Sequence, residues 1–317
     1  MNASVTKLCG EQVKVSIQDF AALRPQLIAR IEAQQLPQGF INIVEQWYWP
    51  MAQHIASQHQ APAGALLVSV NGAQGSGKTT LTSLLSLLLE AAWGLSTADV
   101  SLDDFYLTRA ERLSLAAHVH PLLATRGVPG THDLGLARDT LAVLRHCSAQ
   151  QPCAIPRFNK AIDDRRPPAD WTRIAEPVDV ILFEGWCNHA PLSSAADLLA
   201  PINALEKNED PLGIWRHYVN EQLQHYHEQL FDQADLLIHL AIPGFEVVQG
   251  WRQLQEEKLA ASSPDAGHIM TAGQVERFIQ HYERITLNSL TRLPALADVV
   301  LTISAEHNID GLTINNR

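Results

Sequence analysis

Two rhythms of apolar residues alternate along the chain, one typical of helices and one typical of buried strands. Helical spacing runs through residues 15–58, where Pro37-Gln38-Gly39 interrupts it, and returns at 81–89, which predicts a buried helix ending near Gly94. Short runs rich in Val, Ile and Leu predict five strands, at 66–70, 98–102, 178–183, 236–242 and 297–303. Because long segments separate the later strands, we expect parallel crossovers and a three-layer α/β architecture.

The pattern favours one large domain with a helical addition. Residues 1–60 are expected to form a helical N-terminal extension packed on a core domain at 61–317, which carries lid insertions around 105–172 and 243–290. Pro, Gly and Asp punctuate loop-rich segments at 116–132, 150–172, 187–213 and 260–273. Ligands of open parallel sheets bind at the carboxyl ends of the strands, so we expect substrate contacts in these insertions.

Composition narrows the class of protein. The chain has 317 residues, 46% hydrophobic and 18% charged, and its net charge of −11 argues against a nonspecific nucleic-acid surface. No apolar run approaches the roughly 20 residues that span a bilayer, and the N-terminus lacks a hydrophobic signal core. We therefore expect a cytoplasmic protein that contacts neither membrane nor nucleic acid. The four cysteines lack C-x-x-C spacing and are expected to be reduced packing residues.

The stretch 66–80 carries the strongest chemical signal. An apolar run enters Gly72-x-x-x-x-Gly77-Lys78-Thr79 and continues into a leucine-rich helix, which is the context of a phosphate-binding loop. Glycines let backbone N–H groups turn around a phosphate, and the helix adds its positive N-terminal end. We expect Lys78 to reach the β- and γ-phosphates and the Thr79 hydroxyl to bind Mg²⁺. The expected nucleotide contacts are Gly72, Ala73, Gln74, Gly75, Ser76, Gly77, Lys78, Thr79 and Thr80.

Because the α/β pattern contains this loop, we predict a P-loop NTPase fold with a five-stranded, mainly parallel sheet. Two of its strands are predicted to end in carboxylates. Asp103 and Asp104 follow the run 98–102, and we interpret Asp103 as the base or orienter of an acceptor hydroxyl. Glu184 closes the run 178–183 and is interpreted as an acid that holds Mg²⁺ or its water, because a carboxylate ending an apolar run is costly without a cation. The alternatives are a turn-capping aspartate and an exposed glutamate.

Two loops bring arginines toward the expected site. Residues 126–133 combine Arg126 with two glycines and with Asp133, which is expected to cap a helix whose N-terminus can receive an anion. Residues 156–167 hold a denser cluster of both signs, and both loops are expected to bind phosphates or an anionic substrate as a mobile lid. Further lid candidates are Arg252 and Lys258, whereas solvated loop charge is the alternative for any single arginine.

Taken together, the segments GAQGSGKTT, SLDDFYLT, RGVPGTHD, IPRFNKAIDDRR, ILFEGW and WRQLQEEKL resemble the P-loop D-glycerate 3-kinases of plants and related fungal and bacterial kinase-like proteins. The resemblance covers roughly residues 40–310, and uridine kinase, phosphoribulokinase and pantothenate kinase look like more distant relatives. It implies ATP and Mg²⁺ as cofactors and phosphorylation of a small hydroxy acid. The segment 163–168, Asp-Asp-Arg-Arg-Pro-Pro, departs from the glycine-containing plant pattern.

The resemblance also implies roles for individual residues. The residues implied near the acceptor are Asp103, Tyr106, Arg126, His132 and Asp133. Those implied near the transferred phosphate or the substrate are Arg157, Lys160 and Arg166. The expected catalytic set is Lys78, Asp103, Glu184 and Arg166, with Thr79 and Glu184 as metal ligands.

The leading expectation is an ATP-dependent transferase that converts D-glycerate to 3-phosphoglycerate. A kinase of a nucleoside, sugar phosphate or pantothenate-like compound would use the same loop and Asp103. A nucleotide-binding regulator without metabolite turnover is the rival from another class. The guanine-reading Asn-Lys-x-Asp pattern is absent, because Asn159-Lys160 is followed by two apolar residues before Asp163. The oligomeric state does not follow from the sequence.

Overall fold

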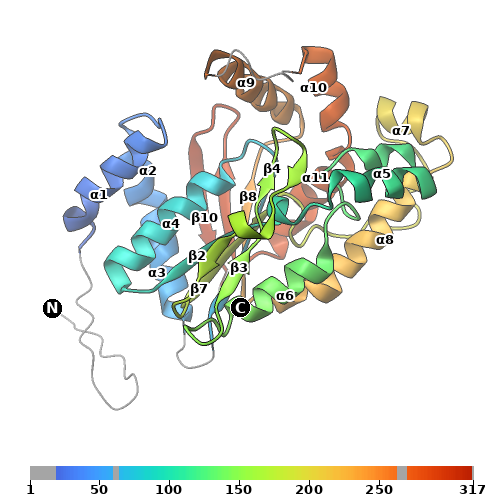
Figure 1. Ribbon diagram of the computed structural model, residues 1–317. Helices are drawn as coiled ribbons and strands as arrows, with labels where there is room; N and C mark the ends of the chain where they lie inside the picture. Colours follow the sequence, from blue (N-terminus) through green and yellow to red (C-terminus); the bar gives the residue numbers. More distant parts are fainter. Residues whose placement is uncertain (1–18, 60–63, 263–269, 316–317) are drawn as a thin grey trace.

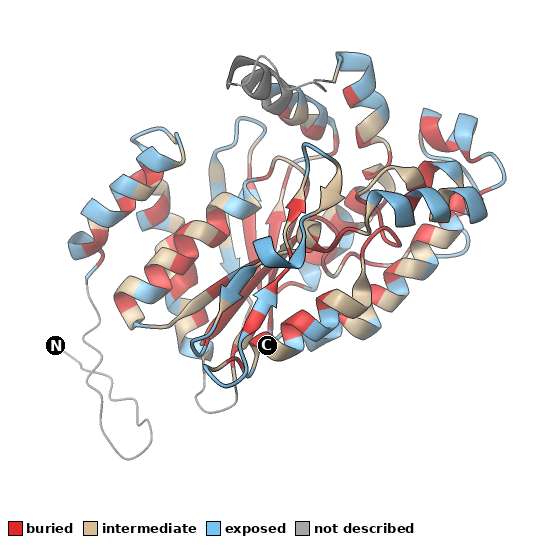
Figure 2. Ribbon diagram, viewed as in Figure 1, coloured by how far each residue is buried: buried red, intermediate tan, exposed pale blue. Residues whose placement is uncertain are grey.

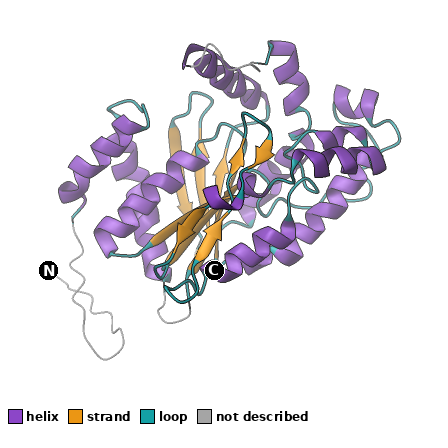
Figure 3. Ribbon diagram, in the orientation of Figure 1, coloured by secondary structure: helices purple, strands orange, loops and turns teal. Residues whose placement is uncertain are grey.

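The computed structural model describes residues 19–59, 64–262 and 270–315, except for the side chains of residues 255–262. These residues contain a six-stranded sheet in the order β10-β9-β8-β1-β7-β2, with helices on both faces (Figures 1 and 3). The five parallel strands match the predicted runs and are β1 (Leu66–Gly72), β2 (Thr97–Ser101), β7 (Val180–Gly185), β8 (Leu236–Ala241) and β9 (Val299–Ile303). The predicted three-layer fold is confirmed.

The sixth strand corrects the prediction of five. Strand β10 (Ile309–Ile314) pairs antiparallel with β9 at the edge of the sheet. Its residues are exposed or only partly buried, so the strand lacks the continuous apolar run that marks the central strands. A half-covered edge strand containing Asp310 and Gly311 gives little sequence signal.

Alternation along the central strands divides the core between the two faces of the sheet. On β7, Val180 and Leu182 join one buried cluster, while Ile181 and Phe183 join the other. The first cluster also takes in the N-terminal helices and α4 (Lys78–Trp93), and burial runs along the inner side of each (Figure 2). These N-terminal elements are α1 (Phe20–Ala33), α2 (Phe40–Ile43), the π-helical turn η1 (Val44–Tyr48) and α3 (Trp49–Gln58). Residues 1–18 and 60 of the predicted extension lie outside the described part, as do residues 61–63 of the predicted core domain.

The second cluster packs α6 and α8 against the opposite face, and shorter elements surround it. The helices here are α5 (Arg109–His118), α6 (Leu134–Leu144), α7 (Ala204–Glu209), α8 (Ile214–Gln229) and α11 (Glu283–Arg292). Helices α9 (Glu246–Ser262) and α10 (Ala272–Ile279) fall within 243–290, the second of the expected insertions. The 3-10 turns are η2 (Leu102–Phe105), η3 (Pro121–Ala124), η4 (Pro168–Asp170), η5 (Phe231–Gln233) and η6 (Leu293–Ala295).

Two predicted loops contain regular structure. Segment 150–172 and the residues just after it form two small antiparallel pairs, β3 (Cys153–Ile155) with β6 (Thr172–Ile174) and β4 (Phe158–Asn159) with β5 (Asp164–Arg165). These strands are only two or three residues long, too short for a period-2 pattern to reveal.

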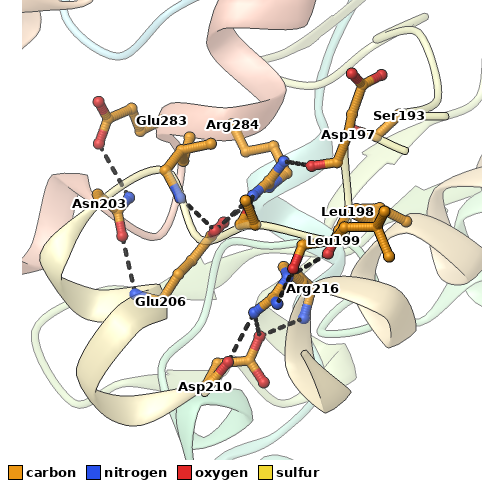
Figure 4. A network of polar contacts seen from close by, with 12 residues as sticks. Ser193, Asp197, Leu198, Leu199, Asn203, Glu206, Asp210, Arg216, Glu283 and Arg284 are labelled. Atoms are coloured by element: carbon orange, nitrogen blue, oxygen red, sulfur yellow. Dashed lines mark hydrogen bonds and ion pairs between the residues drawn. The ribbon is translucent and has the colours of Figure 1, made fainter. Parts of the chain in front are cut away.

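Segment 187–213 contains α7, which two buried ion pairs fix to its neighbours (Figure 4). Glu206 pairs with Arg284 of α11 at 2.6 Å, and Asp210 pairs with Arg216 of α8 at 3.0 Å. Glu206 and Asp210 are 1% exposed or less, so each carboxylate is shielded from water and depends on its arginine partner. The two ion pairs thereby join α7 to α8 and α11.

The structure also bears on two expectations about the type of protein, the state of its cysteines and the absence of membrane-spanning helices. Cys147, Cys153 and Cys187 are buried and free, in line with reduced packing residues, and Cys9 lies outside the described part. Within the described ranges, none of the helices is long and apolar enough to cross a membrane.

Candidate active site

The phosphate-binding loop joins β1 to α4 at the carboxyl edge of the sheet. Strand β1 ends at Gly72 and α4 begins at Lys78. Gly77 has φ +91°, a left-handed conformation that other residues adopt only with strain. A Cβ on Gly72 would lie 2.6 Å from Ser76 Oγ and 2.9 Å from Leu240 Cβ, and because a Cβ cannot rotate away, the close turn favours glycine there as well. The strand, tight turn and helix predicted from 66–80 are therefore present.

Lys78 lies folded back over this loop. Its Nζ donates to the carbonyl oxygens of Gly72 at 2.8 Å and Ala73 at 3.1 Å. Burial lowers the pKa of Lys78, and the nearby carboxylates of Glu184 and Asp103 oppose that shift. In the described part of the chain, its hydrogen-bond acceptors are these two neutral carbonyls, so the ammonium is available to an anionic ligand on the loop.

Thr79 and Glu184 meet across the sheet edge. The Thr79 hydroxyl donates to Glu184 Oε1 at 2.9 Å. Glu184 reaches this point because it is the penultimate residue of β7 and pairs in register with Val70 of β1 and Ser101 of β2. A hydroxyl and a carboxylate are oxygen ligands that suit Mg²⁺ beside phosphate oxygens. No group of three or more His, Cys, Asp or Glu side chains that could hold a metal occurs in the described residues, so these two would rely on phosphate and water for the remaining ligands.

Asp103 lies one turn beyond its strand. Strand β2 ends at Ser101, and Asp103 belongs to the 3-10 turn η2 instead of extending the strand. Its carboxylate accepts from Lys160 Nζ at 2.6 Å and from the Tyr106 hydroxyl at 2.7 Å. Burial works to raise the pKa of Asp103, but Lys160 and Tyr106 outweigh it and lower the pKa to about 2. Asp103 is therefore ionised at neutral pH.

The neighbouring Asp104 faces another way. It accepts from Arg157 Nη1 at 2.6 Å and from the backbone N–H of Phe158 at 3.0 Å. Both partners lie where the chain enters β4, so Asp104 fixes the start of this strand to the sheet edge. This difference favours Asp103 over Asp104 as the group that meets a substrate.

The side chains of Lys78, Thr79, Asp103 and Glu184 line a cavity of about 240 Å³. Its described lining includes four cationic side chains, Lys78, Arg126, Lys160 and Arg252, and two carboxylates, Asp103 and Glu184. The remaining lining residues are Gln74, Gly75, Thr79, Ser101, Tyr106, Gly185, Trp186, Phe278 and Tyr282. The excess of positive charge suits an anionic ligand.

Three residues predicted near the site lie behind the cavity wall or outside it. His132 is 4% exposed and stacks on Tyr106 with ring centroids 4.5 Å apart, and burial lowers its pKa to about 3. His132 is therefore neutral and supports Tyr106 from behind. Asp133 caps α6 through the N–H of Leu136, as predicted, and pairs with Arg165 at 3.3 Å. Arg166 is exposed and does not line the cavity.

Of the other residues predicted for the lid, some line the cavity and others do not. Arg157 binds Asp104 in a neighbouring groove and not in the cavity. Arg252 lines the cavity, whereas the side chain of Lys258 lies outside the described part. The catalytic and binding roles assigned from sequence stay predictions, but the structure brings Lys78, Thr79, Asp103, Tyr106, Arg126, Lys160 and Glu184 together.

Sequence reasoning missed the aromatic wall of the cavity. Trp186 donates its indole N–H to the carbonyl of Gly127 at 2.8 Å, and Tyr282 donates its hydroxyl to the carbonyl of Arg126 at 3.0 Å. The two rings pack edge to face, with centroids 4.9 Å apart. Trp186 stands two residues after Glu184 and was visible as part of the strand end. Tyr282 lies in the turn that precedes α11, and no sequence motif marks it.

No family model matches the chain. The uncharacterised kinase mug58 of Schizosaccharomyces pombe is 32% identical over 225 residues, which cover 68% of this chain and 78% of that protein. Chloroplastic D-glycerate 3-kinase of Arabidopsis thaliana is 30% identical over 249 residues, which cover 76% of this chain and 49% of the plant protein.

Two solved structures resemble this chain as well. D-glycerate 3-kinase from Cryptococcus neoformans superposes with a TM-score of 0.72 at 26% identity, covering 86% of this chain and 99% of that one. The YGR205w protein superposes with a TM-score of 0.62 at 26% identity, covering 87% of this chain and 96% of that one. Both likenesses extend over most of the chain.

Proposed function

The chain belongs to the family of P-loop kinases that contains D-glycerate 3-kinase and its fungal relatives, and on this premise we propose that it phosphorylates a small hydroxy acid with ATP. The leading reaction is D-glycerate to 3-phosphoglycerate. The observation that carries the proposal is the placing of Asp103 and Lys78 on one cavity, next to a phosphate-binding loop. A group that orients a hydroxyl thus faces a group that offsets phosphate charge.

The residues divide the work of an in-line transfer. The loop at 72–80 binds the phosphates of ATP, and Lys78 turns from its two carbonyls toward the γ-phosphoryl group. Thr79 and Glu184 would hold Mg²⁺, which offsets charge on the phosphates. The acceptor oxygen bonds to the γ-phosphorus as the bond to the bridging oxygen breaks, ADP leaves, and the hydroxyl proton passes to Asp103.

Charge supports an acidic acceptor. The described cavity lining holds four cations against two carboxylates, and one of the carboxylates is already paired with Lys160. A hydroxy acid supplies a hydroxyl for Asp103 and a carboxylate that Arg126, which lines the same cavity, can bind.

The test is a panel of acceptors with ATP and Mg²⁺, in which ADP release is followed and products are identified by mass spectrometry. We expect turnover with D-glycerate and 3-phosphoglycerate as the product. Asp103→Asn should lower kcat by roughly two to four orders of magnitude while ATP binding stays near wild type. Turnover only with nucleosides or other uncharged alcohols would exclude a hydroxy acid as the acceptor. ATP binding without turnover of any acceptor would favour the rival function, a nucleotide-binding regulator.

A further inference from the structure

Asp163 stands outside the cavity lining, at the tip of the β4–β5 hairpin, and joins two arginines. Its Oδ2 lies 2.8 Å from Arg112 Nη2, and its Oδ1 accepts from Arg126 Nη1. Its backbone has φ +55°, a left-handed conformation that aspartate adopts more readily than most residues but still with strain. The two ion pairs offset this strain, so the side chain holds the hairpin tip in place.

Arg112 is the fixed end of this arrangement. It projects from α5, is 1% exposed, and donates to the carbonyl oxygens of Leu107 at 3.2 Å and Ala124 at 2.7 Å. It also donates to the backbone carbonyl of Asp163 at 2.9 Å. A buried guanidinium with this many partners cannot turn without leaving donors unsatisfied. Arg112 therefore fixes both the backbone and the carboxylate of Asp163.

Arg126 is the end that faces the cavity. Tyr282 anchors its backbone carbonyl, and its guanidinium lies over the ring of Phe158 at 5.6 Å. A contact with a ring face positions a cation loosely, whereas a carboxylate partner fixes its direction. Among the described ion pairs, Arg126 has Asp163 as its carboxylate. Asp163 uses Nη1, so the other N–H groups of the guanidinium remain for a ligand.

We propose that Asp163 is a positioning residue that aims Arg126 at the carboxylate of the acceptor and thereby sets the preference for acidic over uncharged substrates. The inference rests on the proposed function. The order of contact is Arg112 to Asp163, Asp163 to Arg126, and Arg126 to the ligand. Asp163 holds the guanidinium of Arg126 through one N–H group, so the direction of the remaining N–H groups depends on this contact.

Asp163→Asn is the sharpest test, because asparagine has nearly the same size and also tolerates left-handed backbone but carries no charge. We expect KM for D-glycerate to rise about tenfold or more, while kcat and KM for ATP stay near wild type. The ratio of kcat/KM for D-glycerate to that for glycerol should fall. A role limited to holding the hairpin would not change this ratio.

Two further variants separate charge from backbone strain. Asp163→Gly relieves the strain at φ +55° but removes both ion pairs, so it should reproduce the rise in KM for D-glycerate. Asp164→Asn is the matched control, because Asp164 lies in the same hairpin and accepts from the backbone N–H groups of Arg109 and Arg165. It should leave the glycerate-to-glycerol ratio unchanged.

The outcomes distinguish this inference from the proposed function. Wild-type protein that turns over no hydroxy acid would overturn the proposed function before any variant is made. Active wild type with an unchanged acceptor KM in Asp163→Asn would overturn the role of Asp163 alone. An equal loss toward D-glycerate and glycerol, accompanied by a lower melting temperature in circular dichroism, would assign Asp163 to folding and also overturn its role in specificity.

Discussion

Lys78 and Asp103 line one cavity, yet neighbouring charges affect their pKa values differently. Burial lowers the pKa of Lys78 against the pull of two carboxylates, whereas for Asp103 the cation of Lys160 outweighs burial and lowers the pKa. Asp103 with a pKa of about 2 is a weak proton acceptor at rest. It suits a group that first aligns the hydroxyl and takes the proton late in a loose transition state.

At the same scale, Glu184 is expected to set the magnesium requirement. Glu184→Gln keeps the shape of the side chain but removes its charge, so the Mg²⁺ concentration that gives half-maximal activity should rise roughly ten- to hundredfold. Thr79→Ser is the matched control, because it keeps the hydroxyl that meets Glu184 and should shift the Mg²⁺ titration little. A wild-type titration curve for Glu184→Gln would exclude the proposed role.

Among the elements, the central strands are joined just below the phosphate-binding loop by polar side chains. Asn71 of β1 donates to the carbonyl oxygens of Trp186 and Asn188, which follow β7, at 3.2 and 2.6 Å. Because its amide donates to both, its Oδ1 must accept from Nδ1 of His239 on β8, 2.9 Å away. These bonds hold the end of the loop strand at a fixed distance from the strand that carries Glu184.

Replacing Asn71 with leucine should therefore weaken the fold and the site together. Each buried polar group left unsatisfied costs about 1–3 kcal/mol, so Asn71→Leu should lower the free energy of unfolding by at least that amount. Urea denaturation measures this loss. Asn42→Leu, at an exposed position of α2, is the control and should change stability by less than about 0.5 kcal/mol. Equal stability of the two variants would contradict the structural role of Asn71.

Across the whole molecule, buried histidines couple stability to pH. His132, His239 and His281 are at most 4% exposed, and burial lowers their pKa values to about 3, 4 and 4. Below the ordinary value of 6.5 the unfolded chain takes up protons that the folded chain refuses, so stability falls as pH falls. Asp103 adds a separate loss between its ordinary value of 3.8 and about 2, because its pKa is lowered by native contacts.

Thermal unfolding across pH measures this coupling. We expect the melting temperature to fall steadily from pH 6.5 toward pH 4, with each buried histidine contributing about 1.4 kcal/mol per pH unit at most. His239→Gln should flatten the slope relative to wild type, even if the variant is less stable at neutral pH. A melting temperature that is independent of pH in this range would contradict the lowered pKa values of these histidines.

What the sequence by itself determined is the chemistry carried by contiguous residues. Strand, loop and helix at 66–80 follow one another along the chain, so their backbone geometry and phosphate chemistry are visible in a single stretch. The five buried strands are visible for the same reason, since each is a continuous apolar run. Asp103 and Glu184 were found because acids at the ends of such runs lie at one edge of a parallel sheet.

Only the tertiary structure decided how distant loops meet. Arg126 faces the cavity and Arg166 does not, because hairpin β4–β5 and its contacts set the direction of each side chain. Tyr282 reaches Arg126 across 156 residues, and Asp163 reaches the buried Arg112 across 51. The edge strand β10 likewise depends on pairing with β9. Such contacts form between segments far apart in the chain, so no local pattern of residues encodes them.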